Sequence, residues 1–155
     1  MADTIESRLE AAGVTLPQAA APAANYVPAV TFGSILQTSG QLPMDNGALA
    51  VTGTLGANVD LEAGQRAAKL CAINILAQAK TALGGDLSRI KRLLKLTVFV
   101  ASAPTFTDQH KVANGASDFM VEILGDAGRH ARSAVGVPAL PLGAAVEIEA
   151  LLEIA

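Results

Sequence analysis

The last ten residues of the chain alternate between apolar and other side chains, and this alternation constrains the fold more than any other feature. Every second position from 146 to 154 is apolar, whereas glutamates occupy positions 147, 149 and 153. Successive side chains of a β-strand point to opposite faces, while a helix would mix the two kinds on one face. The run therefore predicts a strand with one face in a core and carboxylates on the other.

A second run with strand character, residues 131–137, precedes it and contains Arg132 among small and apolar residues. The connector, residues 138–143, is rich in proline and glycine, which favours a tight connection between neighbouring strands. We therefore expect the two strands to pair, which would allow Arg132 and Glu147 to share one face of the sheet.

The rest of the chain supplies helices and strands in alternation. The pattern predicts a helix over 3–12 capped by Asp3, a Pro/Ala linker over 16–25, a hairpin from 26–32 and 35–38, a turn at 44–47, a helix over 60–83, a strand over 89–101, and a helix from about 106 or 108 to 124. In the strand over 89–101, Leu94 is expected to face the core and Leu93 the opposite side.

This order predicts an α+β fold with one mixed sheet, two long helices packed on one face, and a short N-terminal helix. The 155 residues suit a single domain over 1–155, in which 1–24 form an N-terminal helix and linker extension. Two helices cover only one face of such a sheet. The other face, with Leu93, Phe99 and Leu151, predicts contact with another subunit, and a charged fraction of only 16% agrees with this.

Charge and residue spacing argue against several classes of function. The net charge of −3 does not favour nucleic-acid binding, and the basic residues between 89 and 95 alternate with apolar ones as in a solvated strand. His110 and His130 stand far apart without ligand-like neighbours, so no metal or cofactor is expected. The lone Cys71 lies on an apolar helical face and reads as core. Without a signal-like start or a long apolar run, we expect a cytoplasmic protein that does not enter a membrane.

Four positions are candidates for chemistry, each with a plain structural alternative. The guanidinium of Arg132 suits a carboxylate held by two hydrogen bonds, or an ion pair with Glu147 or Glu149. Desolvation would make Glu147 a general acid or base, although an exposed glutamate at the rim of the sheet fits as well. Ser39 lacks the sequence of a nucleophile elbow and reads as a strand-ending turn. His130 reads as a polar residue before a strand, with a titratable site residue as the alternative.

Five segments in order resemble the Rid/YjgF family: 26–27, 38–43, 96–100, 130–137 and 147–150. The resemblance covers residues 24–155 and implies a chorismate-mutase-like fold and a homotrimer with clefts between subunits. In the deaminating members, residues matching Arg132 and Glu147 bind the substrate carboxylate and activate water. Ser39 and Gly40 match residues that line the pocket, and Tyr26 matches a tyrosine that closes it. The chain departs from the deaminase pattern in that Ala134 stands where many deaminases have cysteine, and in its N-terminal extension. The loop over 51–60 and the Gly-Arg-His sequence over 128–130 resemble those of a longer YjgF-like subgroup.

The resemblance implies a hydrolytic deaminase that converts reactive enamines or imines, such as 2-aminoacrylate or 2-imino acids, to 2-keto acids and ammonia. The alternative is a non-catalytic trimer that binds a small carboxylate metabolite, with Glu147 purely structural. An endoribonuclease or translation inhibitor is a third interpretation, against which the acidic charge speaks. The sequence leaves open the substrate side chain, turnover as opposed to binding, and the role of His130.

Overall fold

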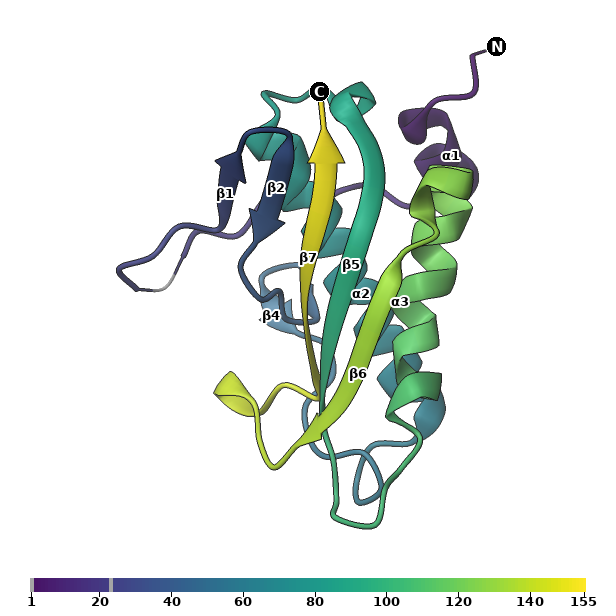
Figure 1. Cartoon of the computed structure of the whole chain (residues 1–155). Coiled ribbons are helices and arrows are strands. Elements are labelled where there is room, and N and C mark those ends of the chain that lie inside the picture. Colours follow the sequence, from purple (N-terminus) through teal and green to yellow (C-terminus); the bar gives the residue numbers. More distant parts are fainter. Residues whose placement is uncertain (1, 23) are drawn as a thin grey trace.

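The computed structural model describes residues 2–22 and 24–155, so residues 1 and 23, the latter within the predicted linker, lie outside it. A five-stranded sheet in the order β1-β2-β7-β5-β6 forms the front layer of the molecule (Figure 1). A small separate ribbon pairs β3 with β4. The elements are α1 (Ile5–Ala11), β1 (Ala29–Phe32), β2 (Ile35–Thr38), β3 (Met44–Asp45), β4 (Ala48–Leu49), α2 (Leu61–Ala82), β5 (Ile90–Ala101), α3 (Gln109–Leu124), β6 (Ala131–Val137) and β7 (Val146–Ile154).

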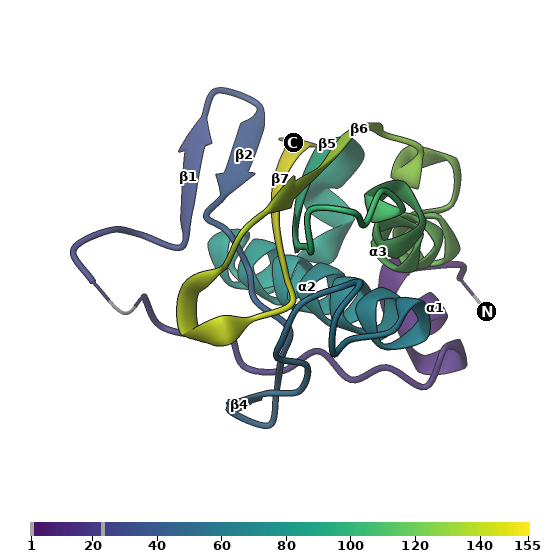
Figure 2. The same cartoon turned by 90° about the horizontal axis from the view of Figure 1, so that it is seen from below.

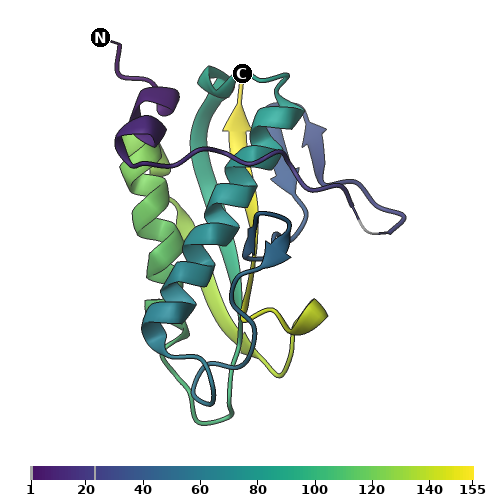
Figure 3. The ribbon, with the colours of Figure 1, turned by 180° about the vertical axis from the view of Figure 1, so that it is seen from behind.

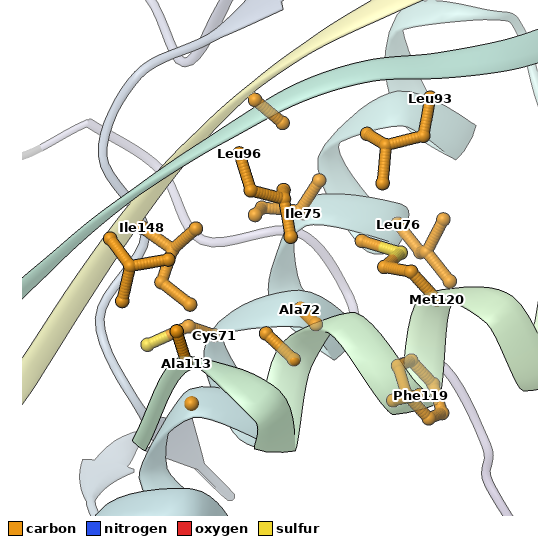
Figure 4. Packing of buried hydrophobic residues seen from close by; sticks show 14 of the residues in the cluster. Cys71, Ala72, Ile75, Leu76, Leu93, Leu96, Ala113, Phe119, Met120 and Ile148 are labelled. Carbon is orange, nitrogen blue, oxygen red and sulfur yellow. The ribbon is translucent and has the colours of Figure 1, made fainter. Parts of the chain in front are cut away.

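The α+β architecture is confirmed: α2 and α3 lie on one side of the sheet, and none of the α-helices in the described residues lies on the other side (Figure 2). Asp60 caps α2 by accepting a hydrogen bond from the main-chain N–H of Ala63 at 2.8 Å. The apolar stripes of the two helices meet the inward face of β5 and β7, and buried Cys71, Ile75, Leu96 and Ile148 come together there (Figure 4). Cys71 is therefore a core residue, as its position in the pattern predicts.

The expected pairing of residues 131–137 with 146–154 is wrong, because β5 lies between the two strands. β6 runs parallel to β5, and β7 runs antiparallel to β5 on its other edge. A parallel pair needs a long crossover connection, and α3 supplies one between β5 and β6. The Pro/Gly-rich connector is therefore not a hairpin; it carries the chain past the end of β5 to the other side (Figure 1).

The faces predicted for the start of β5 are also wrong, because the strand is irregular there. Its register with β7 shifts between Leu93 and Lys95. A β-bulge places two residues opposite one and reverses the alternation of faces. Leu93 is consequently buried in the core, whereas Leu94 is half-buried on the opposite face.

The N-terminal helix begins one residue later than predicted. Thr4 rather than Asp3 is its cap, and Thr4 and Ser7 exchange side-chain-to-backbone hydrogen bonds in a capping box. Asp3 instead lies 2.6 Å from a terminal nitrogen of Arg8. After α1, the chain crosses α2 on the side that faces away from the sheet (Figure 3), and the Gln78 amide donates to the main-chain oxygen of Ala20 at 2.9 Å. This extension is thus bound to α2 by a side-chain hydrogen bond.

The helix-free face of the sheet is partly apolar. Phe99 and Leu151 are half-buried on it, and Val135 is 45% exposed. In the hairpin, Phe32 is 83% exposed. Among the described helices, none is both long and apolar enough to cross a membrane.

Gly115 is required where α3 crosses α2, and substitution by alanine is expected to destabilise the protein. The added methyl carbon would lie 2.7 Å from the main-chain carbonyl carbon of Gln65, so the helices would have to separate. Overpacking costs about 1 to 3 kcal/mol and occasionally more, while alanine returns about 1 kcal/mol of helix propensity. Because main-chain atoms are met, we expect the cost to exceed the gain, and Gly115→Ala to lower the free energy of unfolding by about 1 kcal/mol or more in urea titrations. The exposed Asp118→Ala on the same helix is the control, with an expected change within about 0.5 kcal/mol.

Candidate functional site

Arg132 lies on the edge strand β6 and faces the helices. Its register partner in β5 is Leu96, a fully buried residue of the helix-covered face. The guanidinium Nη1 donates to the Asn114 side-chain oxygen at 2.9 Å and to Ser117 Oγ at 3.1 Å. Nη2 donates to the main-chain oxygen of His110 at 3.2 Å. Three acceptors on α3 therefore fix the plane of this side chain.

These contacts leave one edge of the guanidinium available. Within residues 2–22 and 24–155, Nε of Arg132 donates to no acceptor, and Nη2 uses one of its two hydrogens. The half-buried side chain lines a shallow cavity of about 240 Å³ with Ser117, Val121, Arg129 and His130. Nε and Nη2 together form the fork that binds a carboxylate with two hydrogen bonds. The arrangement is suited to holding an anionic ligand at the edge of the sheet.

His130 is connected to Arg132 through Ser117. Its Nδ1 lies 2.6 Å from the main-chain oxygen of Gly128, and its Nε2 lies 2.9 Å from Ser117 Oγ. Burial lowers the pKa of His130; the hydrogen bond to Gly128 opposes this and the positive charge of Arg132 adds to it. His130 is the residue before β6, as predicted. It also belongs to a chain of hydrogen bonds that ends on the guanidinium group of Arg132.

Glu147 lies on the opposite face of the sheet. It stands next to Phe99 in the register of β5 and β7, on the helix-free side. Burial raises the pKa of its carboxyl group, and the negative charge of Glu149 on the same face raises it further. The carboxyl carbon would lie 2.8 Å from a methyl group added at Gly40. A larger residue at position 40 would therefore displace the end of the Glu147 side chain from this place.

Ser39 precedes Gly40 in the chain, and Tyr26 lines a cavity together with Gly40. The Ser39 hydroxyl donates to the main-chain oxygen of Val27 at 2.7 Å, which ties the end of β2 to the residues before β1. Tyr26 is 51% exposed. A cavity of about 170 Å³ is formed by Tyr26 and Gly40 together with Ala20, Ala21, Pro22, Pro28, Gln41, Leu42, Met44 and Gln78.

The expected placement of Arg132 and Glu147 on one face is thus wrong, and so is an ion pair between Arg132 and Glu147 or Glu149. The five candidate residues form two groups: Arg132 on the helix side of β6, and the remaining four on the far edge and open face. β5 separates the two groups, because it lies between β6 and β7. The ion pairs found among the described residues do not include Arg132.

Two other kinds of site receive little support. A separate cavity of about 560 Å³ opens near the ends of β5 and β6, but its lining, which includes Thr54, Ser102 and Gln109, contains no group that titrates near neutral pH. Across the described part of the chain, no three His, Cys, Asp or Glu side chains gather as metal ligands would. The titratable chemistry therefore lies with the two groups above.

Residues 6–154 match the family described as YjgF/chorismate mutase-like, "putative endoribonuclease". The chain belongs to the YjgF family. The mixed sheet with helices on one face agrees with that fold, as the sequence resemblance implies.

Three relatives illustrate the range of sequence identity between this chain and other proteins of the YjgF family. Protein TCP17 of Trypanosoma cruzi is 51% identical over 151 residues, which cover 97% of this chain and 94% of TCP17. The crystal structure of Atu1372 from Agrobacterium tumefaciens shares 56% identity, covers 97% of this chain and 92% of its own, and has a TM-score of 0.93. The structure of Escherichia coli TdcF with bound serine is 26% identical over 89% of this chain and 94% of its own, with a TM-score of 0.64.

The sequence analysis of this YjgF-family chain missed Asn114 and Ser117. Together with His110 and Val121 they recur at spacings of four, three and four along α3, which is the spacing of one helical stripe. That stripe is polar where it meets Arg132. A polar stripe adjoining the apolar one is the signal that could have identified these partners of Arg132.

Proposed function

We propose that this protein assembles as a cytoplasmic homotrimer in which Arg132 of one subunit and Glu147 of its neighbour form one site for a small carboxylate. The observation that carries the proposal is the guanidinium of Arg132, fixed by three acceptors on α3 with its Nε and Nη2 edge free. A single chain keeps this edge away from Glu147, on the other side of β5. A second copy over the apolar open face would supply the missing half.

The reaction we propose is hydrolysis of a 2-imino acid, or of the enamine 2-aminoacrylate after its tautomerisation to the imine. Arg132 holds the carboxylate, which fixes C2 of the substrate next to Glu147 of the neighbouring subunit. Glu147 accepts a proton from water as the water oxygen bonds to C2, and passes it to the nitrogen as the C=N bond becomes a single bond. Glu147 then accepts the proton of the new C2 hydroxyl group as the C=O bond forms and the C–N bond breaks. This proton goes to the departing nitrogen, so ammonia leaves and a 2-keto acid remains.

Several features support this chemistry. Burial and Glu149 raise the pKa of Glu147, which makes its carboxylate a better base than an exposed glutamate. TdcF, a relative, has been solved with serine, a small molecule with a carboxylate. Gly40 lies against Glu147, and Tyr26 lines a cavity with Gly40. We propose that these two residues and Ser39 line the end of the cleft that holds the substrate side chain.

A carboxylate-binding protein without turnover is the second candidate. It is favoured by the position of Ala134, which offers no reactive side chain two residues after Arg132. Arg132 is held by α3 alone, so binding does not require Glu147 to be catalytic. Ribonuclease activity, which the family description names, is less well supported, since the net charge is −3.

The deciding experiment compares ammonia release from freshly generated 2-imino acids with and without the protein. Imines produced in situ by an amino-acid oxidase decay spontaneously, so the spontaneous rate is the baseline. Release above it with several side chains supports the deaminase, and light scattering reports the trimer. Binding of pyruvate without faster release would support the binding protein instead.

The acid limb of the rate is expected to move when Glu149 is neutralised. Glu147 acts as a base only when ionised, so turnover should rise with pH through its raised pKa. Because the charge of Glu149 contributes to the raised pKa of Glu147, Glu149→Gln should shift the acid limb to lower pH. The pH profile of kcat/KM measures the shift. Glu153→Gln, an exposed glutamate on the same strand, is the control and should leave the limb in place.

A further inference from the structure

The chain of hydrogen bonds from Gly128 to Arg132 has only one consistent direction when the imidazole is neutral. The main-chain oxygen of Gly128 can only accept, so Nδ1 of His130 carries the proton. The bare Nε2 then accepts the hydroxyl hydrogen of Ser117 at 2.9 Å. This turns the lone pairs of Ser117 Oγ toward Arg132, whose Nη1 donates to them at 3.1 Å. The tautomer follows from the network rather than from observed hydrogens.

The turn that carries Gly128 fixes the start of this chain. Gly128 is buried, and an added methyl carbon would lie 2.8 Å from the carbonyl carbon of Met120 in α3. The main chain at this turn is therefore pressed against the helix that also carries Ser117. Both ends of the imidazole are held by the same packed unit, so the position of His130 is set by the fold and not by a free side-chain rotation.

We propose that His130, acting through Ser117, is a positioning residue for Arg132 that keeps the Nε and Nη2 edge of the guanidinium open to a carboxylate. The inference rests on the proposed carboxylate site. Ser117 is not the nucleophile of a serine–histidine pair, because its oxygen already accepts a hydrogen bond from a cation, which lowers its nucleophilicity. Without an imidazole at position 130, the Ser117 hydroxyl can rotate its hydrogen toward Arg132 and weaken the Nη1–Oγ hydrogen bond. A protonated His130 donates from Nε2 to Ser117 Oγ, so in both charge states the imidazole leaves a lone pair of Oγ available to Arg132.

The same chain links carboxylate binding to the protonation of His130. A carboxylate on Arg132 offsets the positive charge that opposes protonation of His130, so the bound ligand raises the pKa of this histidine. By reciprocity, protonation of His130 tightens carboxylate binding. The groups around His130 are Arg132 from β6, Arg129 with its partner Asp126 from the turn, and the uncharged Ser117 and Val121 from α3. Because the pKa of ligand-free His130 lies below its usual value, we expect affinity for pyruvate to rise, by about threefold, as the pH falls below the pKa of an ordinary histidine.

Pyruvate, a stable 2-keto acid, is the probe, and calorimetry of the full-length protein is the measurement. His130→Leu removes the acceptor and should weaken pyruvate binding about fivefold. His130→Gln keeps an acceptor near Ser117 and should bind like wild type, but without the pH dependence. His110→Gln, which preserves the main-chain oxygen that Arg132 uses, is the matched control and should change neither.

A double-mutant cycle tests the route through Ser117. Ser117→Ala should weaken binding about as much as His130→Leu, and the second substitution should add nothing further. If the two effects multiply, His130 does not act through Ser117 and the inference is overturned.

Nitrogen NMR of the ligand-free protein separates this inference from the proposed function. At high pH we expect His130 to carry its proton on Nδ1, and the Arg132 Nε–H signal to broaden in His130→Leu. A proton on Nε2, or an unchanged Arg132 signal, would overturn the positioning role. If wild type binds no pyruvate, the proposed function fails, and these ligand-free signals alone decide the positioning role.

Discussion

Replacement of Arg132 by alanine is expected to reduce affinity for pyruvate and kcat/KM for 2-imino acids by about 100-fold or more. Hydrogen bonds to charged groups contribute about 1.5 to 3 kcal/mol each, and the free edge of the guanidinium offers two of them. A loss of 1.4 kcal/mol is tenfold, so two such bonds account for the expected effect. Titration calorimetry and initial rates of ammonia release measure the two quantities.

The fold should survive this substitution. Arg132 is half-buried, and its three acceptors, Asn114, Ser117 and the main chain of His110, can turn to water when it is absent. We expect the midpoint of thermal unfolding to change by a few degrees at most. Arg132→Lys keeps the charge without the fork and should lose at least about tenfold. Arg129→Ala changes a more exposed arginine of the same cavity and is the control; an equal loss there would argue for general electrostatic attraction rather than a clamp.

Mixed trimers of two inactive variants are expected to regain activity. In the proposed site, Arg132 and Glu147 come from different subunits. A homotrimer of the Arg132→Ala variant lacks the first residue in every site, and a homotrimer of the Glu147→Ala variant lacks the second. When the variants are unfolded together and refolded in equal amounts, about a quarter of the interfaces pair an intact Arg132 with an intact Glu147. Activity should therefore rise from the spontaneous rate to about a quarter of the wild-type rate.

The alternative arrangement gives the opposite result. If one chain supplied both residues, every chain in the mixture would lack one of them, and no active site could form. A simple mixture of the folded homotrimers, without refolding, is the control and should remain inactive while subunits do not exchange. Restored activity in the co-refolded sample alone would show that the two halves come from different chains.

The regular parts of the fold were accessible from local sequence signals. The alternation over 146–154 and the Asp60 cap each identify one element, and the structure has a strand over Val146–Ile154 and a helix that begins directly after Asp60. Strand order was not accessible in this way. Sequence neighbours often pair in space, but the crossover through α3 gives β5 a parallel partner on one edge and β7 on the other. The order of the strands depends on long-range packing, and the Pro/Gly-rich connector does not predict it.

The candidate site was identified only in part for the same reason. Arg132 and Glu147 stand out because a charged residue within an apolar strand is unusual. Their separation on opposite faces depends on which strand lies between them. Asn114 and Ser117 were missed because short polar residues are ordinary on a helix, and only the position of Arg132 beside α3 gives them a role.

The bulge in β5 has a consequence for changes in chain length. Because Leu93 and Leu96 both face the core with two residues between them, removal of one of those two leaves a regular strand in which the same leucines still point inward. A deletion in the regular part of β5, residues 96–101, would turn every later side chain of the strand to the wrong face. We therefore expect β5 to tolerate the loss of one residue at this bulge. The deletion would change the local twist of β5, and with it the angle at which the neighbouring strand β6 holds Arg132. Length variation among related proteins is expected to concentrate there, as a means of tuning the angle of the clamp without rebuilding the core.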